Sequence, residues 1–304
     1  MKKIIAFISI IFLFAISVKA EESKENFYEQ ISRAVIRLEH IEQIKKEGSN
    51  IIETKNIPDG TAFFVASVND LYLVSARHVV EKSYNLHARV RCKNEITKEI
   101  EVIFLKVPKD RWIFHNVTGD NNVNYVDVAV QKIAWIKDRT IKHFRFESKE
   151  SKDFEKNQLP YEDPLPPKSI LSFGFPMDIG FEVLEQRPFG RAGIIAMITG
   201  KEFLKLENGK FAEERSIVLD LDMFPGNSGS PVINKMDITD SKPKLLGLIV
   251  ATNLKMRYAI MEPISRIIET LDLAKGQSKE NINFWSLINT TLKNQPTGHD
   301  SGVK

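Results

Sequence analysis

Short apolar runs, separated by polar or Gly- and Pro-containing segments, recur along most of the chain. In the N-terminal half they occupy 34–38, 60–66, 71–75, 86–92, 100–105 and 126–133. Runs of this length, rich in β-branched and aromatic residues, predict β-strands. Asn69 and Asp70 separate the second run from the third and predict a hairpin there. Together these strands are enough to form a small antiparallel barrel.

A second series of apolar runs follows in the C-terminal half, at 169–174, 181–186, 192–198, 216–222, 230–233, 244–251 and 256–260. After it, Glu262 and Pro263 predict the start of a helix that continues to about residue 273. Apolar residues recur there at the spacing of one helical face: Ile264, Ile267, Ile268 and Leu271. The pattern therefore predicts an all-β fold of two packed six-stranded antiparallel β-barrels with a C-terminal helix.

The remaining segments divide the chain further. Residues 21–33 are polar with a helical pattern and form a predicted lead-in to a domain at 34–272. Residues 135–168 contain mixed charges and four prolines. They predict an exposed connection between a barrel at about 34–134 and a second barrel, with its helix, at about 169–272. Residues 273–304 predict a polar tail.

Residues 1–20 have the layout of a secretory signal peptide. Lys2 and Lys3 precede an apolar run at 4–18, and small residues stand at the cleavage positions before Glu21. The apolar run is shorter than the ~20 residues that span a bilayer comfortably. We therefore expect cleavage and export, to the periplasm or outside the cell, with no membrane anchor afterwards. An uncleaved anchor is the alternative.

The charge balance argues against a nucleic-acid partner. The 304-residue chain has 43 Lys and Arg against 40 Asp and Glu, a formal net charge of +3. Loss of Lys2, Lys3 and Lys19 with the signal would leave the mature chain neutral, whereas nucleic-acid binders normally have a basic surplus. The single cysteine, Cys92, cannot form an internal disulfide, and its strand-like surroundings predict a small core residue.

One loop combines features that suit nucleophilic chemistry. At 222–231 the sequence reads Asp-Met-Phe-Pro-Gly-Asn-Ser-Gly-Ser-Pro, between two predicted strands. Gly226 and Gly229 permit backbone conformations that a Cβ would forbid, and they leave space around Ser228. Upstream, His78 follows the predicted strand 71–75, and Asp127 begins the pattern Asp-Val-Ala-Val. Serine, histidine and aspartate are the side chains of an acyl-transfer triad, here in the order His, Asp, Ser.

At these residues the chain resembles the chymotrypsin-like (trypsin-like) serine peptidases, over about residues 34–272. It is most similar to their bacterial, disulfide-free branch, which includes the HtrA and glutamyl endopeptidase groups and typically has Gly-Asn-Ser-Gly-Ser-Pro at the nucleophile. The resemblance implies a serine endopeptidase in which Ser228 is the nucleophile, His78 the general base and Asp127 the residue that orients His78. The backbone N–H groups of Gly226 and Ser228 would form the oxyanion hole.

The resemblance also implies a role for Asp222, six residues before Ser228, at the floor of the primary substrate pocket. A carboxylate there would favour Arg or Lys at the cleaved position. The alternative is that Asp222 caps a turn or pairs locally, because bacterial relatives vary this loop.

The same residues argue against an α/β-hydrolase and leave two other functions open. An α/β-hydrolase needs Gly-x-Ser-x-Gly and a later histidine, but Ser230 replaces the last glycine, and the only histidine after Ser228 is His299 in the tail. Two alternatives stay open: a catalytically weak or inactive module that binds peptides, and a factor that holds unfolded exported proteins. The histidines show no metal-ligand spacing, so we expect no metal or cofactor. The resemblance to peptidases implies polypeptide partners. The oligomeric state stays open.

Overall fold

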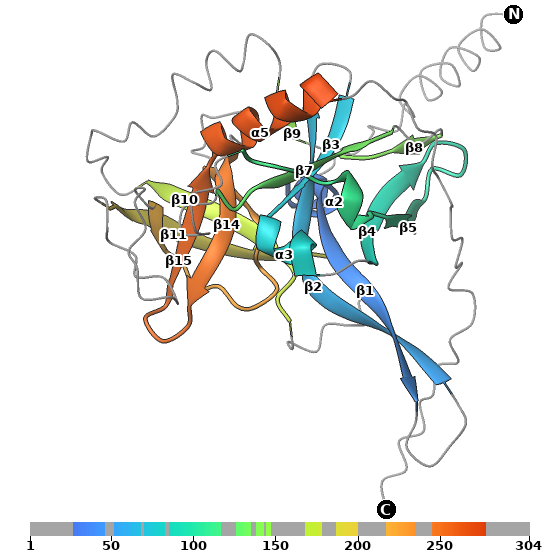
Figure 1. The fold of residues 1–304 in the computed structure, drawn as a ribbon, viewed down its shortest axis with the longest axis horizontal. Coiled ribbons are helices and arrows are strands. Elements are labelled where there is room, and N and C mark those ends of the chain that lie inside the picture. The colour runs from blue at the N-terminus through green and yellow to red at the C-terminus, as the bar shows by residue number, and fades with distance from the viewer. Residues whose placement is uncertain are drawn as a thin grey trace, which may run out of the picture.

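The computed structural model describes residues 27–45, 52–67, 70–82, 85–116, 126–134, 138–142, 144–146, 168–177, 187–199, 217–234 and 245–277. The elements of the N-terminal half are α2 (Phe27–Ala34), β1 (Val35–Lys45), β2 (Ile52–Ser67), β3 (Asp70–Ser75), α3 (Arg77–Lys82), β4 (Leu86–Asn94), β5 (Ile100–Lys106), the 3₁₀ turn η1 (Lys109–Arg111), β6 (Ile113–Phe114), β7 (Ala129–Ile133), β8 (Arg139–Thr140) and β9 (Phe144–Phe146). Those of the C-terminal half are β10 (Ser169–Gly174), β11 (Phe189–Ile198), β12 (Ile217–Asp220), β13 (Pro231–Asn234), β14 (Leu245–Asn253), β15 (Tyr258–Pro263) and α5 (Ile264–Gln277). The two halves form separate β-structures that lie side by side, and the predicted all-β fold is confirmed (Figure 1).

The N-terminal half differs in detail from the predicted six-stranded barrel. Its described residues form a 9-stranded sheet in the order β5-β4-β1-β2-β3-β7-β6, with β8 paired to β4 and β9 paired to β2, and this path does not close. The additional strands β6, β8 and β9 have two or three residues each, too short to give a periodic signal in the sequence. Since β8 and β9 lie within 135–168, the described part of the predicted connection belongs to this sheet.

The β2–β3 hairpin predicted from Asn69 and Asp70 is confirmed by its register, in which Ser67 pairs with Asp70. Strand β3 lies between β2 and β7, and its residues from Leu71 to Ser75 are all buried. This central position explains why the strand reads as a continuous apolar run. It also places the end of β3 directly beside the start of β7, where Ser75 pairs with Ala129.

The C-terminal half is the closed barrel that the sequence predicts. Its strands follow the order β10-β11-β12-β15-β14-β13, with antiparallel pairing throughout. A cluster of buried apolar side chains fills the barrel: Ile170, Ile195, Ile217, Leu219, Leu221, Met223, Val232, Leu246, Ile249, Ala259 and Met261. The predicted strand at 181–186 lies outside the described residues.

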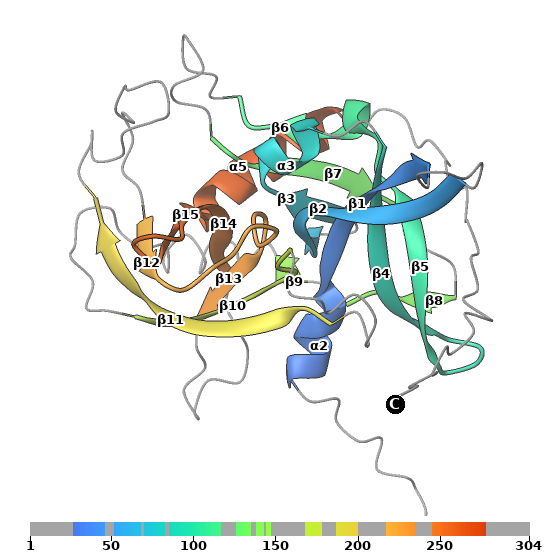
Figure 2. The same ribbon diagram turned by 90° about the horizontal axis from the view of Figure 1, so that it is seen from below.

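Helix α5 joins the two halves. It begins at Ile264, because Glu262 and Pro263 still belong to β15, and it continues to Gln277, beyond the predicted end. Its buried residues Ile264, Ile267 and Leu271 belong to the same apolar cluster as the core of the N-terminal sheet. The helix contacts both β7 and β14, so its packing fixes how the barrel sits against the sheet (Figures 1 and 2).

The helical pattern of the lead-in segment is confirmed over its second part, as α2. This helix lies beside the start of β11 (Figure 2), where the Tyr28 hydroxyl donates a hydrogen bond of 2.9 Å to the Pro188 carbonyl. The predicted signal segment and the tail beyond residue 277 lie outside the described residues.

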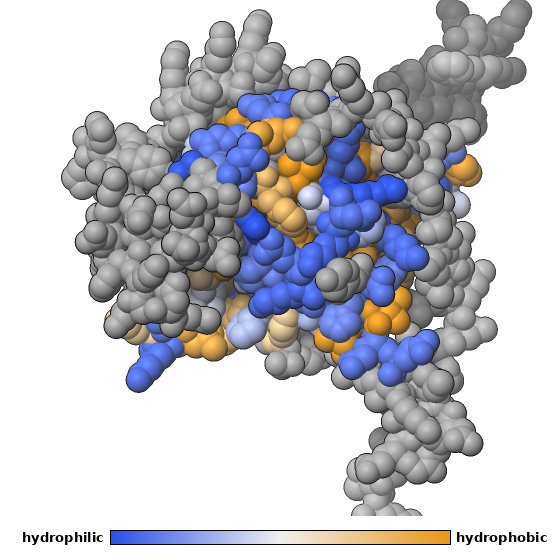
Figure 3. Space-filling model, viewed as in Figure 1, coloured by the Kyte–Doolittle hydropathy of each residue, from blue (hydrophilic) through white to orange (hydrophobic). Residues whose placement is uncertain are grey.

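Cys92 is a core residue, as predicted. Its side chain is fully buried in β4, and burial raises the pKa of the thiol to about 12, so it is protonated at neutral pH. The described surface facing the viewer in Figure 3 is mostly hydrophilic, with smaller apolar patches between the polar side chains. The buried apolar side chains of the described residues form two clusters.

Candidate active site

His78 and Asp127 are brought together by the neighbouring strands β3 and β7. His78 is the second residue of α3, just after β3 ends, and Asp127 lies just before β7 begins. The His78 ring Nδ1 is 2.6 Å from Asp127 Oδ2, and the His78 backbone N–H donates to Oδ1 at 2.9 Å. With an ionised Asp127, Nδ1 carries the ring proton, and Nε2 is left as the acceptor.

The backbone of Asp127 is held as well as its carboxylate. Its N–H donates to Glu262 Oε1 at 3.2 Å, and its carbonyl accepts from the Arg77 N–H at 3.4 Å. The His78 and Asp127 side chains are 26% and 13% exposed, so the pair is largely shielded while part of the ring still reaches the surface. A proton acceptor of this kind is both oriented and accessible.

Ser228 lies in the loop between β12 and β13, which is built as the glycines predict. Gly226 has φ +91° and Gly229 has φ +88°, backbone conformations that favour glycine. The Asn227 N–H donates to the Phe224 carbonyl at 3.1 Å, and the Gly229 N–H donates to the Ile249 carbonyl at 2.7 Å. These bonds turn the loop tightly around Ser228 and fix it to β14.

The loop is also fixed to the N-terminal sheet, close to the helix that carries His78. The Thr61 N–H on β2 donates to the Ser228 carbonyl at 2.9 Å, and the Thr61 hydroxyl donates to the Gly226 carbonyl at 2.8 Å. A Cβ added to Gly60 would lie 2.7 Å from Val79 Cγ1 and 3.2 Å from the Ser228 carbonyl oxygen. The loop and α3 therefore approach the same point of β2 from opposite halves of the molecule.

Two backbone N–H groups of the loop are candidate donors to a bound group. Among the described residues, neither the Gly226 N–H nor the Ser228 N–H has a hydrogen-bond acceptor. The described contacts of Ser228 are made by its backbone, and none of them joins its hydroxyl to the His78 ring. The structure thus contains a bonded His78–Asp127 pair and a serine in an adjacent loop.

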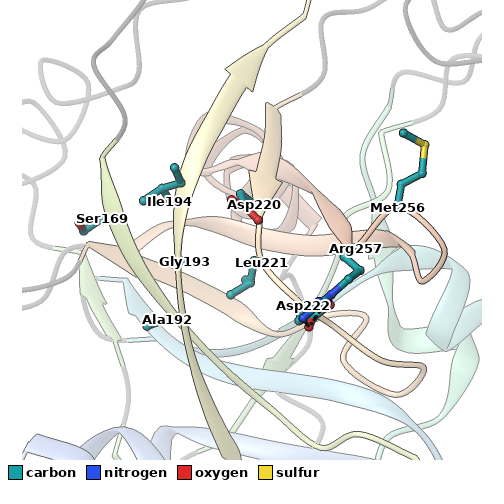
Figure 4. Close-up of a pocket in the computed structure, with 9 residues that line it drawn as sticks. All are labelled: Ser169, Ala192, Gly193, Ile194, Asp220, Leu221, Asp222, Met256 and Arg257. Carbon is teal, nitrogen blue, oxygen red and sulfur yellow. Dashed lines mark hydrogen bonds and ion pairs between the residues drawn. The ribbon is translucent and has the colours of Figure 1, made fainter.

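Asp222 pairs locally with Arg257. Nε of Arg257 lies 3.0 Å from each carboxylate oxygen of Asp222, and Nη2 also contacts Oδ2 (Figure 4). The hydrogen bond from Arg257 lowers the pKa of Asp222 below its usual range. Local pairing, one of the two alternatives from the sequence, describes this carboxylate. A role at the pocket floor stays a prediction.

The pair lies at the edge of an open pocket of about 730 Å³ in the C-terminal barrel (Figure 4). Its lining residues are Ser169, Ala192, Gly193, Ile194, Asp220, Leu221, Asp222, Met256 and Arg257. Neither Ser228 nor His78 is among them. The pocket therefore does not include the candidate nucleophile or base.

A family model, described as the trypsin-like peptidase domain, matches residues 60–237, more than half of the chain. The chain belongs to this family. The matched range contains His78, Asp127 and Ser228, and it lies within the resemblance stated from the sequence. As a member of the trypsin-like peptidases, the chain is classed with protein-cleaving hydrolases.

Several solved structures are similar to this trypsin-like peptidase. The HtrA-type protease AlgW with decapeptide shares 16% sequence identity at a TM-score of 0.49, with 80% of this chain and 65% of that chain covered. An inactive form of Rv3671c from M. tuberculosis H37Rv shares 12% identity at a TM-score of 0.45, with 84% and 94% covered. The chain thus spans less than two thirds of the length of AlgW. A comparison with curated proteins gives no significant match.

Three residues around the trypsin-like site show no sign in the sequence of the contacts that they make in the structure. Thr61 is one residue of a buried strand, Glu262 reads as a helix start, and Arg257 belongs to a short turn before β15. Each contacts a residue more than thirty positions away, so a local pattern could not have found it.

The other histidines of the peptidase show no partner pattern in the sequence, yet two have carboxylate partners in the structure. His40 Nδ1 is 2.7 Å from Asp59, and His115 Nε2 is 2.6 Å from Glu269. His143 and His299 lie outside the described residues.

Within the described residues, no group of three or more His, Cys, Asp or Glu side chains could hold a metal ion. No helix in the same part of the chain has the length and apolar character needed to cross a membrane.

Proposed function

We propose that this trypsin-like peptidase is a serine endopeptidase that works through an acyl-enzyme. The observation that carries the proposal is the pair of hydrogen bonds from His78 to Asp127, one from the ring and one from the backbone. They fix the ring with Nε2 as the free acceptor, as a general base requires. His78 takes the proton of Ser228 while its oxygen attacks the scissile carbonyl, and it returns that proton to the leaving amine.

The oxyanion of the tetrahedral intermediate is bound by the backbone N–H groups of Gly226 and Ser228. Support comes from the lack of any acceptor for either group among the described residues, and from the positive φ of Gly226. Fixed backbone donors need no reorganisation when the negative charge develops. Water then hydrolyses the acyl-enzyme, with His78 again acting as the base.

Polypeptides are the proposed substrates, and Asp222 is the proposed substrate-binding residue. Membership of a peptidase family supports the substrate class. The position of Asp222 at the edge of a pocket, at the start of the loop that carries Ser228, supports its role. The layout of residues 1–20 supports export to the periplasm or beyond. To test this, the protein is purified from the producing cell and the mass of its N-terminal peptide is measured.

Hydrolysis of a quenched fluorescent peptide library tests the triad. We expect Ser228→Ala to abolish turnover, and Asp127→Asn to lower kcat by about 10³–10⁴ because the ring then holds the wrong tautomer. Unchanged circular dichroism of both variants serves as the control for folding. Turnover that survives Ser228→Ala would contradict the proposal.

The second candidate is a catalytically weak or inactive module that binds peptides or unfolded exported proteins. It is favoured by one observation, that the Ser228 hydroxyl has no hydrogen bond to the His78 ring in this structure. Absence of turnover in the wild-type protein, together with saturable binding of an unfolded polypeptide, would support this candidate over the first.

A further inference from the structure

Glu262 connects the C-terminal barrel to the residue that orients His78. It lies in β15, paired with Leu248 of β14, yet its Oε1 accepts the N–H of Asp127 at 3.2 Å. The two residues are 135 positions apart and belong to different halves of the molecule. A single carboxylate therefore reaches across the junction between the barrel and the sheet.

The Asp127 peptide is the part of the site that this contact controls. The carboxylate of Asp127 is fixed by two hydrogen bonds from one residue, His78, which would move together with it. Arg77 precedes His78 in the chain, so its bond to the Asp127 carbonyl would move with the pair as well. Among the described hydrogen bonds of Asp127, the one to Glu262 is therefore the bond that fixes it to the C-terminal half. Because no regular strand pairing includes Asp127, rotation of its peptide would tilt the carboxylate out of the plane of the ring.

We infer that Glu262 is a positioning residue for catalysis, acting through the Asp127 backbone. The inference rests on the proposed function for its kinetic consequence, but the contact itself is independent of it. An N–H group donates a stronger hydrogen bond to a carboxylate than to a neutral acceptor. A neutral oxygen at the same place still accepts a hydrogen bond. A glutamine can therefore replace Glu262, whereas an alanine cannot.

A matched control is available on the adjacent helix. Glu269 of α5 also reaches from the C-terminal half to the N-terminal sheet, where it bonds the His115 ring at 2.6 Å, but it makes no described contact with Asp127. If loss of a carboxylate merely loosened the docking of the two halves, Glu269→Ala would reproduce the effect of Glu262→Ala. If the effect passes through Asp127, it would not.

Kinetics separate these outcomes. We expect Glu262→Ala to lower kcat by about tenfold to a hundredfold with KM changed by less than about twofold, the range for loss of one charge-assisted hydrogen bond. Glu262→Gln should stay within about threefold of the wild type, and so should Glu269→Ala. Equal kcat in the wild type and Glu262→Ala would overturn the inference while leaving the proposed function intact.

A spectroscopic readout keeps the inference testable even if the protein does not cleave peptides. The ring proton between His78 Nδ1 and Asp127 should give a low-field proton NMR signal in the full-length wild-type protein, assigned by its loss in His78→Gln. We expect Glu262→Ala to broaden or abolish this signal, and Glu262→Gln and Glu269→Ala to retain it. An unchanged signal in Glu262→Ala would overturn the inference, whether or not the protein is active.

Discussion

The backbone N–H of Thr61 donates a 2.9 Å hydrogen bond to the carbonyl of Ser228, across the junction between the sheet and the barrel. Thr61 is fully buried, and its hydroxyl donates to Gly226 and accepts from the Phe175 N–H at 3.0 Å. One residue of β2 thus fixes both the candidate nucleophile and the glycine of the proposed oxyanion hole. The spacing of the proposed triad therefore depends on how the two halves dock.

Removal of the Thr61 hydroxyl should impair catalysis more than binding. Thr61→Val keeps the shape but leaves the Gly226 carbonyl and the Phe175 N–H without this partner. We expect the free energy of unfolding to fall by about 1–3 kcal/mol, the cost of leaving a buried group unsatisfied, and kcat to fall because the Gly226 peptide is then less firmly held. Peptide hydrolysis measures the effect, and Thr61→Ser, which keeps the hydroxyl, is the control. A Thr61→Val protein with wild-type kcat would show that this clamp does not set the geometry.

Release of Asp222 from Arg257 should change the specificity. In the wild type Arg257 pairs with the carboxylate, so a basic substrate residue must compete with Arg257 for it. We expect Arg257→Ala to increase cleavage after Arg and Lys several-fold relative to the wild type, and Asp222→Ser to remove any preference for them. A digest of a peptide library, read by mass spectrometry, measures both. Identical cleavage patterns in all three proteins would argue that Asp222 does not contact substrate.

Burial of His87 should make the protein less stable in mild acid. Burial is the main cause that lowers the pKa of His87 below its ordinary value of about 6.5, helped by Lys106 and opposed by Glu39 and the Asn85 backbone. Below that ordinary value the unfolded chain binds a proton that the folded chain does not, so stability falls as the pH drops. Urea unfolding at pH 7.5 and 5.5 should show a smaller loss for His87→Gln than for the wild type. Equal losses would contradict the prediction.

Where sequence and structure agree, the signal is local. The loop around Ser228 needs glycine at two positions of positive φ, and the sequence has glycine at both. The turn could therefore be predicted from the local sequence. The central strand β3 is buried on both faces, so its continuous apolar run also predicts the strand correctly. The resemblance to the trypsin-like peptidases implies the partnership of His78 and Asp127, and the pairing of β3 with β7 supplies its physical cause.

Where the prediction and the structure differ, the cause is pairing between residues that are distant in the sequence. Strands β8 and β9 are too short to show a period, and they exist because β4 and β2 offer them free edges. Glu262 follows an apolar strand and precedes Pro263, which predicts a helix start, but the pairing of Pro263 with Gly247 extends β15 through both residues. The roles of Thr61 and Arg257 likewise depend on residues that only the tertiary fold brings near.

An activated Ser228 should react covalently with a fluorophosphonate, whatever the natural substrate of the peptidase is. The mature wild-type protein is incubated with a fluorophosphonate probe, digested, and the modified residue is identified by mass spectrometry. We expect one probe molecule on Ser228, no labelling of Ser228→Ala, and much slower labelling of His78→Ala. Labelling at another residue, or labelling that survives Ser228→Ala in a folded protein, would contradict it.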